Sequence, residues 1–219
     1  MASCTLFSAC QNSRLMIGDK MEWMNELDEI TAYGREHQIP ILMDESLSLI
    51  KKILKEYEHP RFLEIGTAIG RTSLMAASID PSVRVVTIER DEDMIRQAEE
   101  NFKNSPYAAQ ITFLKGDARE VEIPEGPYDV IFIDAAKSQY KRFFERVSPM
   151  LAENGVIISD NMFFHGLVEH PERTHNRHTK GLIRRLKQYT DYLTSLDGFE
   201  TSVLDIGDGV ALTRRINHA

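Results

Sequence analysis

The chain has 219 residues, of which 42% are hydrophobic and 27% charged, a globular composition that excludes wholesale disorder and fibrous repeats. No apolar run approaches the roughly 18 residues that a membrane span needs, so we expect a soluble protein. Lys and Arg number 26 against 34 Asp and Glu, giving a net charge of −8, which excludes a globally basic nucleic-acid binder but not a local basic patch. Both cysteines, Cys4 and Cys10, lie near the N-terminus, where a disulfide would hold nothing of the core, which favours a cytoplasmic protein.

The N-terminal residues show neither the basic nor the apolar region of a signal peptide, and no hydrophobic periodicity. We expect a disordered extension over residues 1–20 and a single domain over residues 21–219. Helical spacing of apolar residues predicts a helix over 23–37 and a second over 45–58, with Asp44 as the N-cap of the second.

From Arg61 the pattern changes to short apolar strands that alternate with helices, which is typical of a parallel sheet with crossover helices. Strands are predicted at 61–66, 83–89, 111–115, 128–134, 155–159, 199–205 and 210–215, and helices at 70–79, 91–104, 138–151 and 180–196. A polar loop is expected near 164–179, and Gly207-Asp208-Gly209 predicts an antiparallel hairpin between the last two strands. The expected fold is α/β and Rossmann-like, with a mostly parallel seven-stranded sheet. Ligands of such sheets bind at the carboxyl ends of the strands.

Residues at the first three strand ends indicate a site for an adenosine. Gly66 and Gly70 follow the first strand in a GxxxG spacing that differs from the GxGxxG of dinucleotide folds. Glu89 closes the second strand, where a carboxylate can accept hydrogen bonds from ribose hydroxyls or merely stand before a helix. Asp117 can accept from an adenine amino group while the Ala118 N–H meets a ring nitrogen. Together they favour an adenosine without a pyrophosphate, and S-adenosylmethionine fits.

Oxygen-bearing side chains follow the next two strands. Asp134, Asp160 and Asn161 form a ligand set typical of a hard cation such as Mg²⁺, although both acids could instead cap the turns that follow them. Lys137 lies three residues after Asp134, within reach of a hydroxyl beside that cation. It suits a general base, and the alternative is a solvated surface lysine.

The ordered motifs EIGTAIGRTS, TIERD, GDA, FIDAAKSQY, ISDN and IGDGVALTRR resemble the cation-dependent O-methyltransferases, which include the catechol and caffeoyl-CoA enzymes. The resemblance covers roughly residues 38–216 and implies the class I S-adenosylmethionine-dependent methyltransferase fold. Within the family the chain looks most like the bacterial branch that methylates 5-hydroxyuridine at the tRNA wobble position 34 to 5-methoxyuridine. Relatives are commonly homodimers, which the resemblance therefore implies here.

The resemblance also implies a role for individual residues. Cofactor contacts match Met43, Gly66, Ser73, Glu89, Asp117, Ala118 and Asp134, with Ser73 at the methionine moiety. Metal ligands for Mg²⁺, Mn²⁺ or Ca²⁺ match Asp134, Asp160 and Asn161, and the base matches Lys137. The sequence departs from many relatives at Arg71, where they carry an aromatic residue, and no residue matches the family's substrate-side acid.

Methyl transfer needs a substrate with two neighbouring oxygens, and both a catechol and a 5-hydroxyuracil provide them. A tRNA, a small catechol or phenylpropanoid, and a non-catalytic nucleotide- or RNA-binding role are therefore alternatives. The intact Asp134, Lys137, Asp160 and Asn161 set argues against a binding module, and the missing GxGxxG argues against an NAD oxidoreductase. 

A basic segment favours tRNA over a small molecule. Residues 173–187 carry a charge of +6 and no acid, so the rest of the chain carries −14. A body of that charge would repel a polyanion unless a local patch received it. The expected tRNA contacts are Arg173, Arg177, Lys180, Arg184 and Arg185, and Lys187 completes the set of basic residues.

Overall fold

The computed structural model describes residues 27–216, and the chain divides into two compact units, residues 1–41 and residues 42–219. Residues 27–36 of the first unit are helical, as predicted for part of 23–37. The expected start of that helix and the expected disorder of residues 1–20 lie outside the described residues. The single domain over 21–219 stays a prediction.

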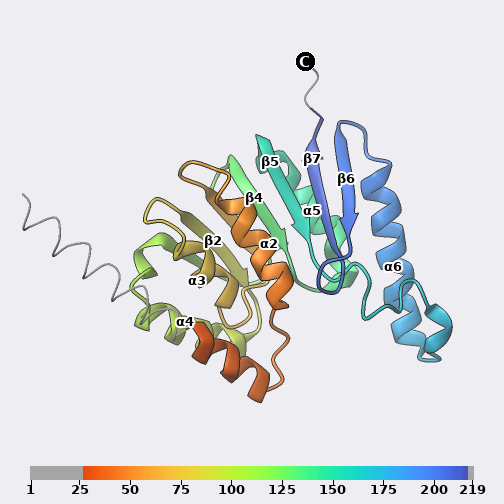
Figure 1. Cartoon of the computed structure of the whole chain (residues 1–219), viewed down its shortest axis with the longest axis horizontal. Helices are drawn as coiled ribbons and strands as arrows, with labels where there is room; N and C mark the ends of the chain where they lie inside the picture. The colour runs from red at the N-terminus through yellow and green to blue at the C-terminus, as the bar shows by residue number, and fades with distance from the viewer. Residues whose placement is uncertain (1–26, 217–219) are drawn as a thin grey trace, which may run out of the picture. The chain divides into compact units, whose positions relative to one another are not determined.

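The second unit is built on one seven-stranded sheet with the order β3-β2-β1-β4-β5-β7-β6 (Figure 1). The parallel strands are β1 (Arg61–Ile65), β2 (Arg84–Glu89), β3 (Ile111–Lys115), β4 (Tyr128–Ile133) and β5 (Leu151–Ser159). β6 (Phe199–Leu204) and β7 (Val210–Arg215) form the predicted antiparallel hairpin. β7 lies inside the sheet against β5, and β6 forms the edge. This arrangement confirms the predicted fold class.

Helices cover both faces of the sheet. They are α2 (Asp44–Leu54), α3 (Arg71–Ala77), α4 (Glu92–Asn104), α5 (Tyr140–Val147) and α6 (Arg177–Thr194), with 3₁₀ turns at Ala108–Gln110, Lys137–Gln139, Ser148–Met150 and Pro171–Arg173. α2 packs on α3 at the near face in Figure 1, whereas α5 lies behind the sheet and packs on α6. Among the described residues, no helix combines the length and apolar character needed to span a bilayer.

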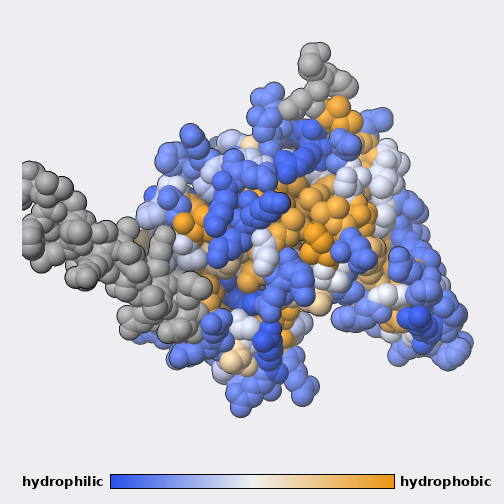
Figure 2. Space-filling view, viewed as in Figure 1, coloured by the Kyte–Doolittle hydropathy of each residue, from blue (hydrophilic) through white to orange (hydrophobic). Residues whose placement is uncertain are grey.

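The core is centred on β1, β4 and β5, whose strands are apolar along almost their whole length. Phe62, Leu63, Ile131 and Ile157 have no exposed surface. Continuous apolar runs are expected where a parallel strand is covered on both faces. Full burial of each such large apolar side chain stabilises the folded state by about 1.5–3 kcal/mol. Figure 2 shows apolar surface over β5 and β7 beside α2, while the surface of α6 is mostly hydrophilic.

Several boundaries differ from the predictions: α2 ends at Leu54 rather than at residue 58, and α5 covers Tyr140–Val147 rather than 138–151. Asp44 is not the N-cap of α2, because Met43 takes that position while the Asp44 carboxylate pairs with Arg71. β5 begins at Leu151 rather than Gly155, and its pairing with β4 is irregular between the Leu151–Tyr128 pair and the Val156–Val130 pair. α6 begins at Arg177, and Asn176 caps it by accepting hydrogen bonds from the backbone N–H groups of His178 and Thr179.

Candidate active site

The carboxyl ends of the parallel strands meet at one edge of the sheet. Ile65 of β1 pairs with Ile88 of β2 and with Ile133 of β4, and Ile133 pairs with Ser159 of β5. The residues after these strands continue the ladder, because the Asp134 N–H donates to Ile65 at 2.9 Å and the Asp160 N–H to Ile133 at 3.2 Å. The structure therefore brings the residue groups predicted for cofactor and cation to neighbouring strand ends.

Gly66 allows the turn after β1 to pass close to the backbone that follows β4. Its φ is +104°, and a Cβ atom there would lie 1.9 Å from the carbonyl oxygen of Asp134. Because any side chain would collide with that backbone, only glycine lets the turn after β1 cross the end of β4. The Gly66 N–H donates to Ile88 of β2 at 3.0 Å, which fixes the turn against both neighbouring strands.

Asp134 and Asp160 form a pair of acids at the ends of β4 and β5. Burial raises the pKa of Asp134, the charge of Asp160 raises it further, and Lys137 opposes the shift. Burial likewise raises the pKa of Asp160, against hydrogen bonds from Asn161 at 2.5 Å and from the Ser46 hydroxyl at 3.3 Å. Two carboxylates and an amide here fit a hard cation, because its charge would relieve the unfavourable ionisation of the pair. No cluster of three His, Cys, Asp or Glu among the described residues offers another metal site.

Lys137 opens the 3₁₀ turn that follows β4, at the same edge. Its charge acts on both Asp134 and Asp160. Its Nζ lies 5.7 Å from the centre of the Phe164 ring, in the segment after β5. An ammonium over an aromatic face is attracted to it, so Phe164 helps to direct the lysine toward this end of the sheet. The structure thus brings Lys137 close to the acid pair, and its role as a general base stays a prediction.

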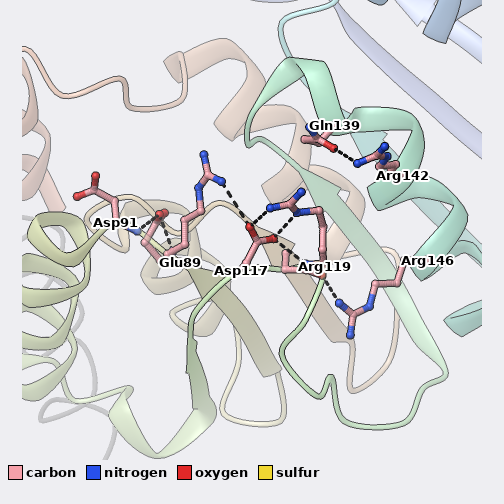
Figure 3. A network of polar contacts seen from close by, with 9 residues as sticks. Glu89, Asp91, Asp117, Arg119, Gln139, Arg142 and Arg146 are labelled. Carbon is pink, nitrogen blue, oxygen red and sulfur yellow. Dashed lines mark hydrogen bonds and ion pairs between the residues drawn. The ribbon is translucent and has the colours of Figure 1, made fainter.

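Glu89 is held by backbone donors at the end of β2 (Figure 3). Its carboxylate accepts from the N–H groups of Ala68 at 2.9 Å, Arg90 at 2.8 Å and Asp91 at 3.0 Å. Asp91, and not Glu89, is the N-cap of α4. These bonds give Glu89 part of the structural role that we considered as an alternative. They also fix the carboxylate between the β1 turn and β2, where a ribose would be held.

Asp117 follows β3 and is enclosed by arginines (Figure 3). Arg119 donates to both carboxylate oxygens, at 2.9 and 2.6 Å, and Arg90 approaches one of them at 3.4 Å. The hydrogen bonds from Arg119 hold the pKa of Asp117 well below its usual range. Arg146 of α5 donates to the carbonyls of Ala118 and Val121, which fixes the adjoining turn. An adenine amino group would have to share Asp117 with Arg119, whose side chain is 39% exposed.

A buried carboxyl that the sequence analysis did not assign lies behind this site. Glu64 of β1 accepts hydrogen bonds from Ser73 and, at 2.7 Å, from Thr87, and burial raises its pKa to about 8. Ser73, expected at the methionine moiety, has no exposed surface and gives its hydroxyl to Glu64. The sequence does show this glutamate within the apolar run of β1, and a glutamate is rarely buried there unless its carboxyl group has partners.

Arg71, where the sequence departs from many relatives, anchors the segment before α2. Its guanidinium donates to the Leu42 carbonyl at 2.8 Å and pairs with Asp44. Met43 lies between these two anchors and is 47% exposed. Arg71 therefore shapes the rim that carries Met43, and it leaves the ligand set untouched.

Comparison with known proteins identifies the family. The O-methyltransferase family model matches residues 15–216. The chain belongs to the O-methyltransferase family. It is 27% identical to a caffeoyl-CoA O-methyltransferase of Populus kitakamiensis over 207 residues, which are 89% of this chain and 87% of the relative.

Solved structures share the fold of this O-methyltransferase. A Staphylococcus aureus protein, assigned provisionally as a caffeoyl-CoA O-methyltransferase, matches with a TM-score of 0.83 and 32% identity, over 94% of this chain and all of that one. The SAH-bound methyltransferase PaMTH1 of Podospora anserina matches with a TM-score of 0.77 and 23% identity, over 99% of this chain and all of that one.

Replacing Glu89 with alanine tests the ribose contact in this O-methyltransferase. We expect Glu89→Ala to weaken S-adenosylhomocysteine binding by about 1.5–3 kcal/mol, the range for hydrogen bonds to a charged group. Calorimetric titration measures the effect, and Glu92→Ala, an exposed acid in the first turn of α4, is the control. An unchanged dissociation constant in a folded Glu89→Ala variant would return the residue to a purely structural role.

Proposed function

We propose that this O-methyltransferase moves the methyl group of S-adenosylmethionine to a substrate oxygen that neighbours a second oxygen. The carbon–sulfur bond breaks as the carbon–oxygen bond forms, sulfur keeps the electron pair, and S-adenosylhomocysteine leaves. Lys137, in its neutral amine form, receives the hydroxyl proton at Nζ and becomes the ammonium. Asp134, Asp160 and Asn161 would hold a divalent cation, which favours the oxyanion of a bound hydroxyl. Holding the oxygen and the methyl group in line at about 3 Å supplies much of the acceleration.

The adenosine side of the cofactor would be held by residues of the first three strand ends. Glu89 would accept from the ribose hydroxyls, and Asp117 with the Ala118 N–H would meet the adenine. Met43 would pack on the cofactor from the segment before α2. The neighbouring position of these groups along one edge, set by the strand register, supports this assignment. The methyl group would then face the ends of β4 and β5.

For the substrate we propose 5-hydroxyuridine at the wobble position of tRNA, and the basic segment carries this choice. Its cations lie in the Pro171–Arg173 turn and in α6, and all are exposed: Arg173, Arg177, Lys180, Arg184, Arg185 and Lys187. None of them makes an ion pair with another described residue, unlike Arg90, Lys115 and Arg119 elsewhere on the surface. Unpaired cations are available to phosphates.

The position of this segment also fits a substrate that reaches the strand ends. It follows Asp160 and Asn161 along the chain, and the first turns of α6 lie toward the same edge of the sheet (Figure 1). A groove of 470 Å³ runs beside α6, with Ile183 in its wall and Lys180, Arg184 and Lys187 around it. An anticodon loop suits such a surface because its unstacked bases can be turned out into a pocket.

Removing three of these cations tests the proposal. We expect replacement of Arg177, Arg184 and Arg185 with alanine to weaken tRNA binding and to lower its salt slope by about 2–3, roughly one for each lost phosphate contact. Methylation of a small catechol should barely change. Replacement of Lys51 and Lys52 in α2 and of Lys55 directly after it removes the same charge from exposed positions elsewhere and is the matched control. Normal binding and methylation of hydroxylated tRNA across the salt series would exclude this segment as the docking surface.

The relatives favour one second candidate. The Populus protein is a caffeoyl-CoA O-methyltransferase, and a catechol-like phenylpropanoid offers the same pair of oxygens as 5-hydroxyuracil. Nucleoside mass spectrometry of tRNA from cells without this protein separates the two, because only the tRNA activity predicts loss of 5-methoxyuridine. Efficient methylation of catechols by the purified chain, with none of hydroxylated tRNA, would establish the small-molecule function.

A further inference from the structure

Three residues of the segment 161–165, which follows β5 and Asp160, adopt an unusual backbone. Asn161, Phe164 and His165 have φ values of +60°, +48° and +57°, a region that residues with a side chain rarely occupy. Such conformations persist only where the surroundings determine them, and they gather at functional sites. This segment carries the predicted cation ligand Asn161 and the Phe164 ring that faces Lys137. We call Asp134, Lys137, Asp160 and Asn161 the acceptor half of the site. Whatever holds residues 161–165 therefore also sets the geometry of this acceptor half.

The turn between β6 and β7 holds this segment through consecutive hydrogen bonds. The Met162 N–H donates to the Gly209 carbonyl and the Phe163 N–H to the Asp208 carbonyl, both at 2.9 Å. The His165 N–H donates to the Asp208 carboxylate at 2.5 Å. The side chain of Asp208 thus binds the last residue of the strained segment, from a position 43 residues further along the chain.

The surroundings of Asp208 leave it little freedom. The residue is 8% exposed, and its second carboxylate oxygen has no hydrogen-bond partner among the described residues, with the His165 ring nitrogen 3.4 Å away. A Cβ atom on Gly209 would lie 2.6 Å from the Phe163 ring, so turn and segment are in close contact. A buried carboxylate with an unsatisfied oxygen lowers the stability of the fold, so its presence calls for a compensating role.

We propose that Asp208 is a positioning residue for the acceptor half of the site. By accepting from the His165 N–H it fixes the segment 161–165, and so places Asn161 beside Asp160 and Phe164 against Lys137. Its contacts with His165 and Phe163 lie on the segment after β5, and none of them involves Glu89, Asp117 or Ala118. The consequence for cation binding rests on the proposed function, whereas the order of the segment does not.

Two variants and a control separate this role from general folding. Asp208→Ala removes the acceptor, Asp208→Asn keeps an oxygen that can accept from His165, and Asp205→Ala alters an exposed acid of the same hairpin. Hydrogen exchange of peptides covering 161–168 in the metal-free chain reports the order of the segment. Titration with Mn²⁺ reports the cation site, and titration with S-adenosylhomocysteine reports the cofactor side.

We expect Asp208→Ala to speed exchange in 161–168 by about tenfold and to weaken Mn²⁺ binding by about tenfold, as for one lost hydrogen bond to a charged group. Affinity for S-adenosylhomocysteine should stay within about twofold. Asp208→Asn should recover most of both losses, and Asp205→Ala should match the wild type. Unchanged exchange in Asp208→Ala, or an equal loss in Asp208→Asn and across the whole chain, would overturn the proposal. If the wild type itself bound no Mn²⁺, the cation site would fail while the exchange data still decided the role of Asp208.

Discussion

Asp160→Ala is expected to abolish methyl transfer while S-adenosylhomocysteine still binds with nearly unchanged affinity. Asp160 lies at the end of β5 with Asn161 and Ser46 bonded to its carboxylate, on the side of the site away from Glu89 and Asp117. Removing it takes one of the two acids from the proposed cation set but none of the adenosine contacts. Its charge also raises the pKa of Asp134, so the metal-free variant loses a repulsion that the native chain carries.

Two measurements separate these effects. Initial methylation rates with added Mg²⁺ report the chemistry, and calorimetric titration reports the cofactor. Asp197→Ala, at an exposed acid after α6, controls for the loss of a negative charge. Near wild-type turnover by the Asp160→Ala variant in the presence of a chelator would show that the proposed cation has no part in the reaction.

Lys137→Met is expected to lower the rate by about 10²–10⁴, the usual effect of losing a general base. Methionine keeps much of the length and apolar character of the lysine stem but removes the ammonium that faces Asp134, Asp160 and the Phe164 ring. At high pH the substrate hydroxyl loses its proton to solvent more readily, so part of the rate should return. A pH series of single-turnover rates measures both the loss and the recovery.

The control is Lys141→Met, one helical turn further along. Lys141 pairs with Glu145 at 3.8 Å and its ammonium lies 4.4 Å from the centre of the Tyr192 ring. Like Lys137 it is a lysine over an aromatic ring, but it does not face the Asp134–Asp160 pair. We expect its rate to match that of the wild type. Full activity of Lys137→Met at neutral pH would leave Lys137 a surface lysine, and the proton would need another acceptor.

The strands and the placement of the strand-end residues could be predicted because both depend on local pattern. β3 and β7 have the bounds that their apolar runs indicated, and a parallel sheet necessarily brings the ends of such strands to one edge. The start of β5 could not be predicted from an apolar run, because residues 152–155 separate Leu151 from Val156. The Leu151–Tyr128 pair is also divided from the rest of the ladder by an irregularity. Its pairing is a property of two strands rather than of one.

Contacts between residues distant in sequence account for the other features that could not be predicted. Asp44 has the composition of an N-cap, yet its carboxylate is taken by Arg71 from α3. Asp117 stays predicted to meet an adenine amino group, and the sequence did not show that its carboxylate is also approached by Arg90, 27 residues earlier in the chain. Asp208 was visible only as part of a turn, because its bond to His165 joins residues 43 positions apart. No periodicity or spacing records such partners.

The position of β7 has a consequence for how the enzyme is made. Val156 to Ser159 of β5 pair with β7, and the turn before β7 holds the segment that follows Asp160. During synthesis Asp134, Lys137, Asp160 and Asn161 leave the ribosome well before that strand exists. A nascent chain stalled at Leu204 therefore carries every residue of the acceptor half in an unfinished form. We therefore expect the acceptor half to complete its fold last, and methyl transfer to require synthesis beyond Arg215, where β7 ends.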